Sequence, residues 1–417
     1  MKRVMLGVAL VSMSASAEDV KTFLQAAEQG SVDLRISIEQ RNRAAAEYRQ
    51  AWTGLFPTLS ASAGWTHNQY KAEFNNPLTG TTAVIVPLDQ FEAAFRFEVP
   101  LIDTTRWFRA SASATAEEGA VLREQAMRDA IRRQVVASYY GYAASLAVRE
   151  ASKRSAAVAL EQLKLTEIRT NVGTVTELDL LRSKAEAART KQTLADTEAL
   201  VATSRRTVRT LTGLDPPEAL PMPVDDLTPA APLADLEARI EQLPAVQAAD
   251  KDAQASGKLA TASRLALVPL ISAQFTERIT NATSFTGQAA AYNAGINLAW
   301  RLDVPTFMGM QVQSSNEQVA QLASERSRLL ARDQVNGDWQ RLQAALIKVE
   351  AARAQLEAAQ RATQVARDRY AVGAATQLDV ITAERDVFGA DVNHIQARTE
   401  LSTARASLRI SAALPLE

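Results

Sequence analysis

The side chains that most often carry chemistry are few and widely separated in this chain. Its 417 residues include no cysteine and only two histidines, His67 and His394. Without cysteine there can be no disulfide, thiolate metal site or cysteine nucleophile. No phosphate-binding loop, HExxH, GxSxG or dinucleotide-binding motif occurs either. We therefore expect no catalytic residue, no metal site and no cofactor, and an enzyme is the weakest of the possible functions.

Two aspartates have a spacing that indicates a defined local role. Asp179 and Asp379 each stand three residues after a threonine, which is the spacing of a helix-starting capping box. Gly173 and Gly373 lie six residues before them. A glycine between two helical runs predicts that one helix ends there and another begins.

The elements that position these turns are unusually long. Prolines are absent from residues 101–215 and 306–414, and both stretches are rich in strong helix formers. We expect long helices over 104–172 and 306–372, each roughly 100 Å in length at about 1.5 Å per residue. Helices of this length need partners along their whole length, as in coiled coils or a helical tube. Shorter helices are expected over 19–55, 175–213, 232–267 and 375–413.

The chain contains an internal repeat. The segment RTNVGTVTELDLL (169–181) aligns with RYAVGAATQLDVI (369–381) at an offset of 200, with six of thirteen positions identical. We interpret this as a tandem duplication. The first structural repeat covers 18–214, a proline-rich linker covers 215–231, and the second repeat covers 232–417.

Each repeat also contains a segment in which apolar residues alternate with polar ones. This alternation, within residues 56–102 and 268–302, predicts two β-hairpins with one apolar face. The resulting four strands are long enough to cross a bilayer as part of a β-barrel. Four strands cannot close a barrel, so several chains would have to share one. A small water-soluble sheet packed on a coiled coil is the alternative.

The start of the chain indicates export. Residues 1–17 (MKRVMLGVALVSMSASA) combine two basic residues, an apolar stretch and a small-residue cleavage site, as in a secretory signal peptide. The whole chain has 46 basic and 47 acidic residues. This balance argues against a nucleic-acid binder that works through bulk positive charge.

Together these features resemble the TolC family of outer-membrane efflux proteins. The resemblance rests on Leu-Phe-Pro-Thr-Leu (55–59), Val-Pro-Leu-Ile-Asp (99–103) and the paired Arg-x-x-Val-Gly-x-x-Thr-x-Leu-Asp motifs. It implies a mainly α fold whose long helical hairpins form a trimeric α-barrel tunnel in the periplasm. It also implies that four strands per chain contribute to a shared twelve-stranded barrel, in contact with outer-membrane lipid. Such a homotrimer would be a passive exit duct that docks to a periplasmic adaptor (membrane fusion protein) and an inner-membrane transporter.

The resemblance also implies roles for individual residues. Asp179 and Asp379 would line the closed periplasmic mouth as a pore gate. Tyr370 would donate a hydrogen bond to Asp179 and so help to hold the mouth closed. The Val-Gly turns would be tips that the adaptor contacts, through Arg169, Val172, Gly173, Thr174, Arg369, Val372 and Gly373. The alternative is that the glycines serve only as helix C-caps and the aspartates only as capping residues.

A second function remains open at this stage. A periplasmic coiled-coil scaffold or adaptor without a membrane channel would also need long helices and an export signal. That function leaves the alternating strands unexplained. The resemblance does not specify the exported cargo, because drugs, metal ions and secreted proteins leave through similar ducts and the pump selects among them.

Overall fold

The computed structural model describes residues 20–75, 77, 80, 82–223 and 225–415, so the expected signal peptide 1–17 lies outside the described residues. The chain divides into two compact units, and each takes segments from both halves of the sequence. We name them the hairpin unit and the sheet unit. The hairpin unit comprises the described residues within 1–37, 124–244 and 328–417, and the sheet unit comprises those within 38–123 and 245–327.

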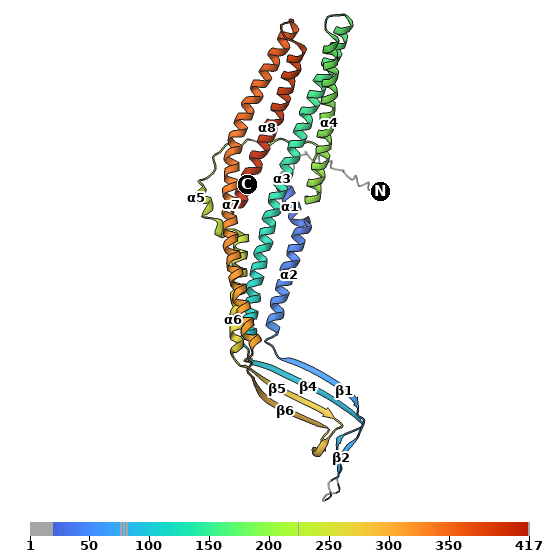
Figure 1. Ribbon diagram of the computed structural model, residues 1–417, viewed down its shortest axis with the longest axis vertical. Coiled ribbons are helices and arrows are strands. Elements are labelled where there is room, and N and C mark those ends of the chain that lie inside the picture. Colours follow the sequence, from blue (N-terminus) through green and yellow to red (C-terminus); the bar gives the residue numbers. More distant parts are fainter. Residues whose placement is uncertain (1–19, 76, 78–79, 81, 224, 416–417) are drawn as a thin grey trace, which may run out of the picture. The chain divides into compact units, whose positions relative to one another are not determined.

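Four long helices supply most of the hairpin unit. They are α3 (Thr104–Asn171), α4 (Glu177–Thr212), α7 (Val304–Ala371) and α8 (Gln377–Ser411), of which α3 and α7 begin in the sheet unit. Figure 1 shows α4 beside the C-terminal part of α3, and α8 beside the C-terminal part of α7. The four helices expected over these segments are therefore observed, with ends that differ by at most two residues.

The turn between the helices of each hairpin has the same backbone structure. Gly173 and Gly373 adopt left-handed conformations, with φ of 75° and 78°. The N–H of Thr174 donates to the carbonyl of Arg169 at 3.0 Å, and Ala374 donates to Arg369 at 2.8 Å. This is the Schellman pattern, in which the last carbonyls of the helix accept hydrogen bonds from the turn. The left-handed conformation that it requires is strained for any residue other than glycine. Capping boxes then start α4 and α8, as the threonine–aspartate spacing predicts.

An apolar core of the hairpin unit lies between α7, α8 and the short helix α5 (Leu233–Glu237). Leu342, Ala345 and Val349 face it from α7 at helical spacing. Leu401 and Leu408 face it from α8. The apolar stripe of each helix therefore holds the hairpin together, and the polar residues between the stripes remain free for other contacts.

The two shorter helices expected over 19–55 and 232–267 are interrupted. The first is split into α1 (Val20–Gly30) and α2 (Val32–Thr53), because the Ser31 hydroxyl accepts the N–H of Leu34 and starts a new helix. The second is split into α5, η1 (Ile240–Gln242), α6 (Pro244–Arg264) and η2 (Leu265–Leu267). Pro244 has no N–H, so it suits the first position of α6 and cannot continue a helix from before it.

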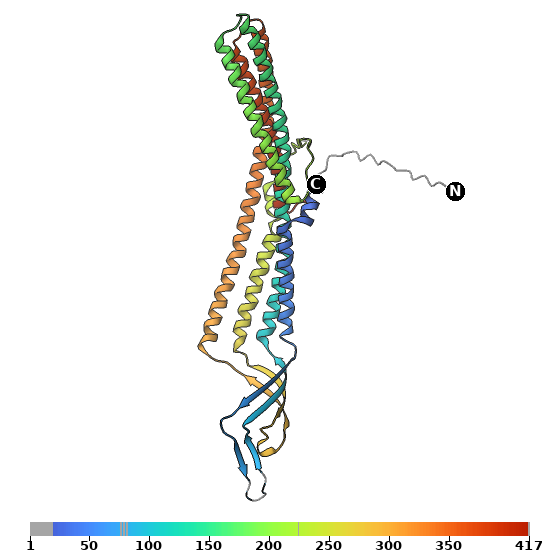
Figure 2. The same ribbon diagram turned by 90° about the vertical axis from the view of Figure 1, so that its right-hand side faces the viewer.

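The sheet unit carries a four-stranded antiparallel sheet (Figure 2). Its strands are β1 (Thr58–His67), β4 (Asp89–Ile102), β5 (Leu270–Thr280) and β6 (Ala290–Ala299), in the order β1-β4-β5-β6. The predicted hairpins are thus observed, and β4 pairs with β5 to join them. Among the described residues, no helix combines the length and apolar character needed to cross a bilayer.

The register of the sheet separates an apolar face from a polar one. Leu59 is opposite Phe97, which is opposite Phe275 on the next strand. Because alternate residues share a face, this face collects the aromatic residues of all four strands, together with Glu277. The other face carries serine, threonine and asparagine, together with a Glu92–Arg278 ion pair of 2.8 Å.

The tip of the first hairpin carries two further strands, β2 (Ala72–Asn75) and β3 (Thr82–Val86). The β-branched run Val84-Ile85-Val86 favours an extended backbone there. Phe74 on β2 packs edge-on against Phe285 of η3 (Ser284–Thr286), with ring centroids 5.5 Å apart. The added hairpin is therefore held against the loop that follows β5.

Candidate functional site

The turn ends of the two helical hairpins carry all the residues singled out by the sequence. Val172 and Val372 are 68% and 80% exposed at the turns, with no apolar covering. Arg169 and Arg369 are also exposed, and their carbonyls are the acceptors of the Schellman bonds. The Thr174 hydroxyl adds a bond of 3.0 Å to the carbonyl of Arg169, which Ala374 of the second turn cannot make. The two turns thus have the same backbone conformation but expose different polar groups.

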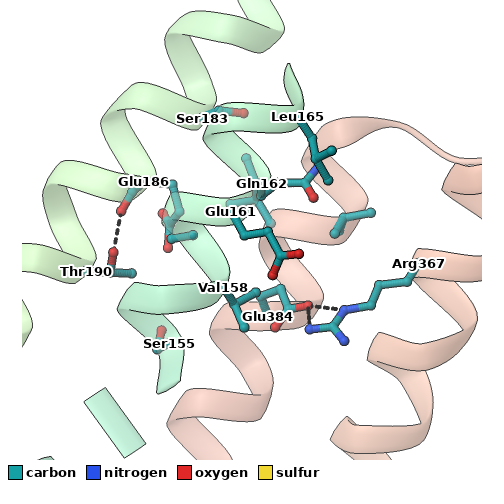
Figure 3. A pocket seen from close by; sticks show the side chains of 13 residues that line it. Ser155, Val158, Glu161, Gln162, Leu165, Ser183, Glu186, Thr190, Arg367 and Glu384 are labelled. Atoms are coloured by element: carbon teal, nitrogen blue, oxygen red, sulfur yellow. Dashed lines mark hydrogen bonds and ion pairs between the residues drawn. The ribbon is translucent and has the colours of Figure 1, made fainter. Parts of the chain in front are cut away.

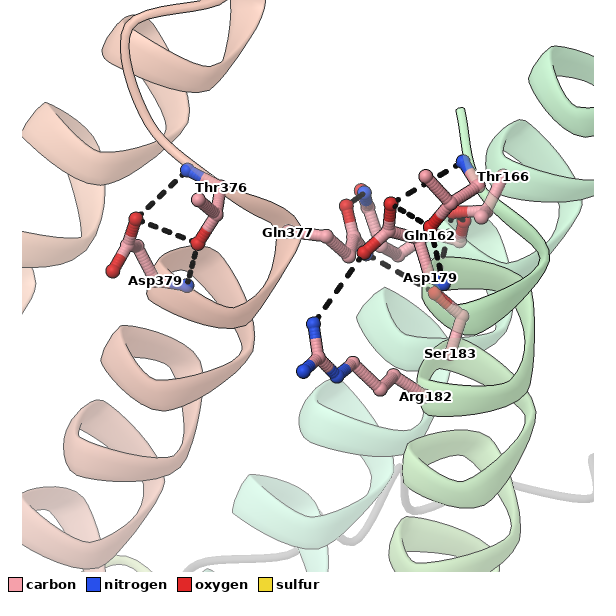
Figure 4. A network of polar contacts seen from close by, with 9 residues as sticks. Gln162, Thr166, Asp179, Arg182, Ser183, Thr376, Gln377 and Asp379 are labelled. Carbon is pink, nitrogen blue, oxygen red and sulfur yellow. Dashed lines mark hydrogen bonds and ion pairs between the residues drawn. The ribbon is translucent and has the colours of Figure 1, made fainter. Parts of the chain in front are cut away.

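Asp179 and Asp379 both serve capping boxes, yet their surroundings differ (Figure 4). Asp379 is exposed, and one of its oxygens accepts the N–H and the hydroxyl of Thr376 at 2.7 and 2.8 Å. The backbone hydrogen bond from Thr376, followed by the one from its hydroxyl, lowers the pKa of Asp379. Asp179 forms an ion pair with Arg182 at 3.6 Å. Asp379 therefore has no ion-pair partner in the described part of the chain, whereas Asp179 has Arg182.

Tyr370 does not form the expected hydrogen bond to Asp179 within the chain. Its hydroxyl is buried and has no hydrogen-bond partner among the described residues. The Tyr370 ring instead lies under the guanidinium of Arg169, 5.3 Å from the ring centroid, in a cation–π contact. Within the chain the Asp179 carboxylate is directed to Thr176 and Arg182, and the hydrogen bond from Tyr370 stays a prediction. The contact between Arg169 and Tyr370 still joins the ends of α3 and α7.

A buried polar chain joins the two hairpins one turn further from the tips. Gln377 is only 2% exposed, and its amide nitrogen donates to the hydroxyl of Ser183 at 3.1 Å. The amide of Gln162 donates to the carbonyl oxygen of Gln377 at 3.0 Å. Figure 4 shows Gln377 reaching from the start of α8 to α3 and α4. Because buried polar groups are costly when unpaired, these bonds favour the packed arrangement of the hairpins.

An ionic contact reinforces this chain of hydrogen bonds. Glu186 on α4 is buried and accepts from Arg385 on α8 at 2.5 Å and from Arg189 at 2.5 Å. Burial acts to raise the pKa of Glu186, but the hydrogen bonds from Arg189 and Arg385 outweigh it and lower the pKa. We call Gln162, Ser183, Gln377, Glu186 and Arg385 the inter-hairpin clasp.

Two more ion pairs connect the hairpins further along the helices. Arg154 on α3 contacts Asp391 on α8 at 2.8 Å. Arg133 on α3 contacts the fully buried Asp338 on α7 at 3.0 Å. The hairpins are therefore joined by polar contacts at several levels, and these contacts are individually weaker than an apolar core.

Sequence reasoning missed the clasp, although one signal was present. Gln377 aligns with Glu177 of the first repeat, and Glu177 is exposed. The exchange of an acid for an amide at equivalent positions indicates that the second position is buried. Glu186 and Arg385 carry no such signal, because charged residues are frequent along all four helices.

Among the described residues no cluster of histidine or acidic side chains could hold a metal ion. The arrangement is suited to a mechanical role in which two hairpins stay together or separate at their turn ends. A model of the outer membrane efflux protein family matches residues 23–214 and 236–413. The chain belongs to this family. It is a family of efflux proteins and not of enzymes, as the sequence features predict.

Efflux proteins of the outer membrane are also the relatives found by sequence and by structure. The chain is 25% identical over 285 residues to the outer membrane efflux protein BepC of Brucella suis, covering 66% of this chain and 61% of BepC. It is 24% identical to the toluene efflux pump outer membrane protein TtgC of Pseudomonas putida, covering 90% of this chain and 79% of TtgC. The fold matches the outer membrane channel CmeC of Campylobacter jejuni with a TM-score of 0.81 at 16% identity, over 95% of this chain and 85% of CmeC.

Proposed function

We propose that this efflux-family protein is the outer-membrane exit duct of a tripartite efflux or secretion system. The observation that carries the proposal is the sheet, whose four strands place their apolar side chains on one exposed face. Exposed apolar patches of this extent are rare in water-soluble monomers. A lipid-facing barrel wall accounts for that face, and the polar face would then line an aqueous lumen. The scaffold alternative accounts for neither face.

The strand order supports assembly as a homotrimer. β1 and β6 are the edge strands, and their outer edges have no strand partner among the described residues. Unpaired backbone groups are strongly unfavourable in hydrocarbon. Three copies, with β6 of one chain beside β1 of the next, would close a twelve-stranded barrel and remove every edge.

The turn ends of the hairpins would form the periplasmic mouth of the duct. Three copies of Asp379, each exposed and ionised at neutral pH, would place a ring of negative charge at this mouth. Such a ring attracts cations and repels anions. Asp179, paired with Arg182, contributes less to this charge. The inter-hairpin clasp would help to hold the mouth closed, together with the predicted Tyr370–Asp179 hydrogen bond.

The exposed valines of the two turns would be the contact points of a periplasmic adaptor. Val172 and Val372 project at fixed positions because the left-handed glycines and the Schellman bonds fix each turn. Arg169 and Arg369 flank them with positive charge. An adaptor surface that offers an apolar pocket beside acidic side chains would suit both turns, and an inner-membrane transporter would complete the system.

The duct is tested by purifying the full chain in detergent and reconstituting it into planar bilayers. We expect a trimer by light scattering and discrete ionic currents that favour cations. Asp379→Asn should reduce the cation preference, whereas Asp368→Asn on the same hairpin should not change it. A monomer that remains in the periplasmic fraction without detergent would contradict the proposal.

A further inference from the structure

A cavity lies between the two hairpins, next to the clasp. It encloses about 260 Å³ within the hairpin unit, between α3, α4, α7 and α8 (Figure 3). Ligand cavities in proteins begin at about this size. Its position is about 18 Å from the turn of the first hairpin, since Glu161 precedes Gly173 by twelve residues along α3. The cavity therefore belongs to neither the exposed turns nor the capping aspartates.

The walls of the cavity combine five apolar side chains with eight polar or charged ones. Side chains of both hairpins contribute, so a molecule inside would touch the first and second hairpin at once. The apolar lining residues are Val158, Ala159, Leu165, Val380 and Ile381. Gln162, Ser183 and Glu186 of the clasp also line the cavity. A bound molecule would consequently lie against the bonds that hold the hairpins together.

Three carboxylates line the cavity, and two of them are ion-paired. Glu384 is paired with the single lining cation, Arg367, at 2.5 Å. Glu186 is paired with Arg189 and Arg385, as described above. Glu161 also lines the cavity and has no ion-pair partner among the described residues. Figure 3 shows its carboxylate directed toward the cavity, on the same side as Glu384.

We propose that this cavity binds a compact amphiphilic cation. The apolar body of the ligand would lie against the valine, leucine and isoleucine side chains, and its ammonium group would form an ion pair with Glu161. Because both hairpins supply the walls, bound ligand would favour the arrangement in which the hairpins are packed together.

Two probes of equal shape and different charge test the site. 1-Adamantylamine has a compact apolar cage with a protonated amine, and 1-adamantanol has the same cage without charge. We expect titration calorimetry of the full chain in nanodiscs to show binding of the amine, with binding of the alcohol about fivefold weaker. The difference is limited to this size because Glu161 is partly open to solvent, which screens its charge.

Variants of the chain distinguish the contribution of the Glu161 charge from that of the cavity volume. In Glu161→Gln the amine and the alcohol should bind with about equal affinity. Glu167→Gln, which changes an exposed acid on the same helix, should keep the preference for the amine. Val158→Trp should fill the cavity and abolish binding of both probes. If this variant loses its helical circular dichroism, Ser155→Phe at the same cavity replaces it.

Equal affinity of the two probes for the unaltered chain would overturn the proposal, as would unchanged binding in the filled variant or no binding of the amine. The measurement requires no ionic current. A failure of this site would therefore leave the exit-duct function untouched, and a chain that conducts no ions could still bind the amine.

Discussion

At the scale of single residues, Gln377 is the side chain whose loss should weaken the hairpin contacts most directly. Gln377→Ala removes two hydrogen bonds: the Gln162 amide loses its acceptor, and the buried Ser183 hydroxyl, which still donates to Thr166, loses its donor. Leaving such groups unsatisfied costs about 1–3 kcal/mol in the free energy of unfolding. Denaturant unfolding followed by circular dichroism measures this change. Gln192→Ala, an exposed amide on α4, is the control and should stay within about 0.5 kcal/mol of the unaltered chain.

Two glycines of opposite backbone conformation provide a second test at this scale. Gly173 has φ of 75°, and a Cβ built there would contact nothing within 4 Å, so only the backbone conformation opposes a side chain. Gly173→Ala should therefore destabilise the chain by about 1–2 kcal/mol. Gly389 lies inside α8 with equally open space, and Gly389→Ala should stabilise by about 1 kcal/mol. Thermal unfolding of both variants gives the comparison, and shifts of the same sign would contradict the assignment of the turn.

At the scale of the helices, acid should loosen the contact between α4 and α8. The pKa of Glu186 is lowered from its ordinary value of 4.5 in the folded chain. A carboxyl group with a lowered pKa contributes stability that is present above the unfolded value and is lost as the pH falls through the folded value. The contact should thus be intact at neutral pH and weaken below about pH 4.5.

Spin labels can report this loosening, because the chain has no cysteine of its own. Labels at Lys184→Cys and Asp386→Cys, both exposed, should give a narrow distance distribution at pH 7 and a broader one at pH 4. With Glu186→Gln added, the distribution should already be broad at pH 7 and should change less with acid. An acid response that is identical with and without Glu186 would assign the effect to other carboxyl groups.

The helices and strands could be predicted from the sequence because their signals are local. Glycine between helical runs, threonine three residues before aspartate, and alternation of apolar residues each act within one segment. The clasp could not be predicted in this way. Glu186 and Arg385 meet only because two hairpins pack with particular helix faces together, and one sequence does not determine that rotation. The Tyr370–Asp179 bond follows from the resemblance alone, and it stays a prediction because the Asp179 carboxylate is directed to Thr176 and Arg182 within the single chain.

At the scale of the whole molecule, the sheet has two faces of opposite character and two unpaired edges. An exposed apolar face and open sheet edges are both unfavourable for an isolated chain in water. Assembly into one shared barrel would remove both. A shared barrel places the apolar face in lipid, encloses the polar face and pairs β1 with β6 of a neighbour. Assembly and membrane insertion should therefore fail together when the apolar face is disrupted.

Two neighbouring residues of β1 allow this to be tested with one change of side chain. Ala63 pairs with Ala93 on the apolar face, whereas Ser62 pairs with Ala94 on the polar face. Arginine in the lipid-facing band of a barrel costs about 2–4 kcal/mol, and in a water-filled lumen it costs little. Ala63→Arg should therefore deplete the trimer from the outer-membrane fraction on non-denaturing gels. Ser62→Arg should assemble normally and shift the ionic selectivity toward anions. Equal amounts of trimer for the two variants would show that the apolar face does not contact lipid.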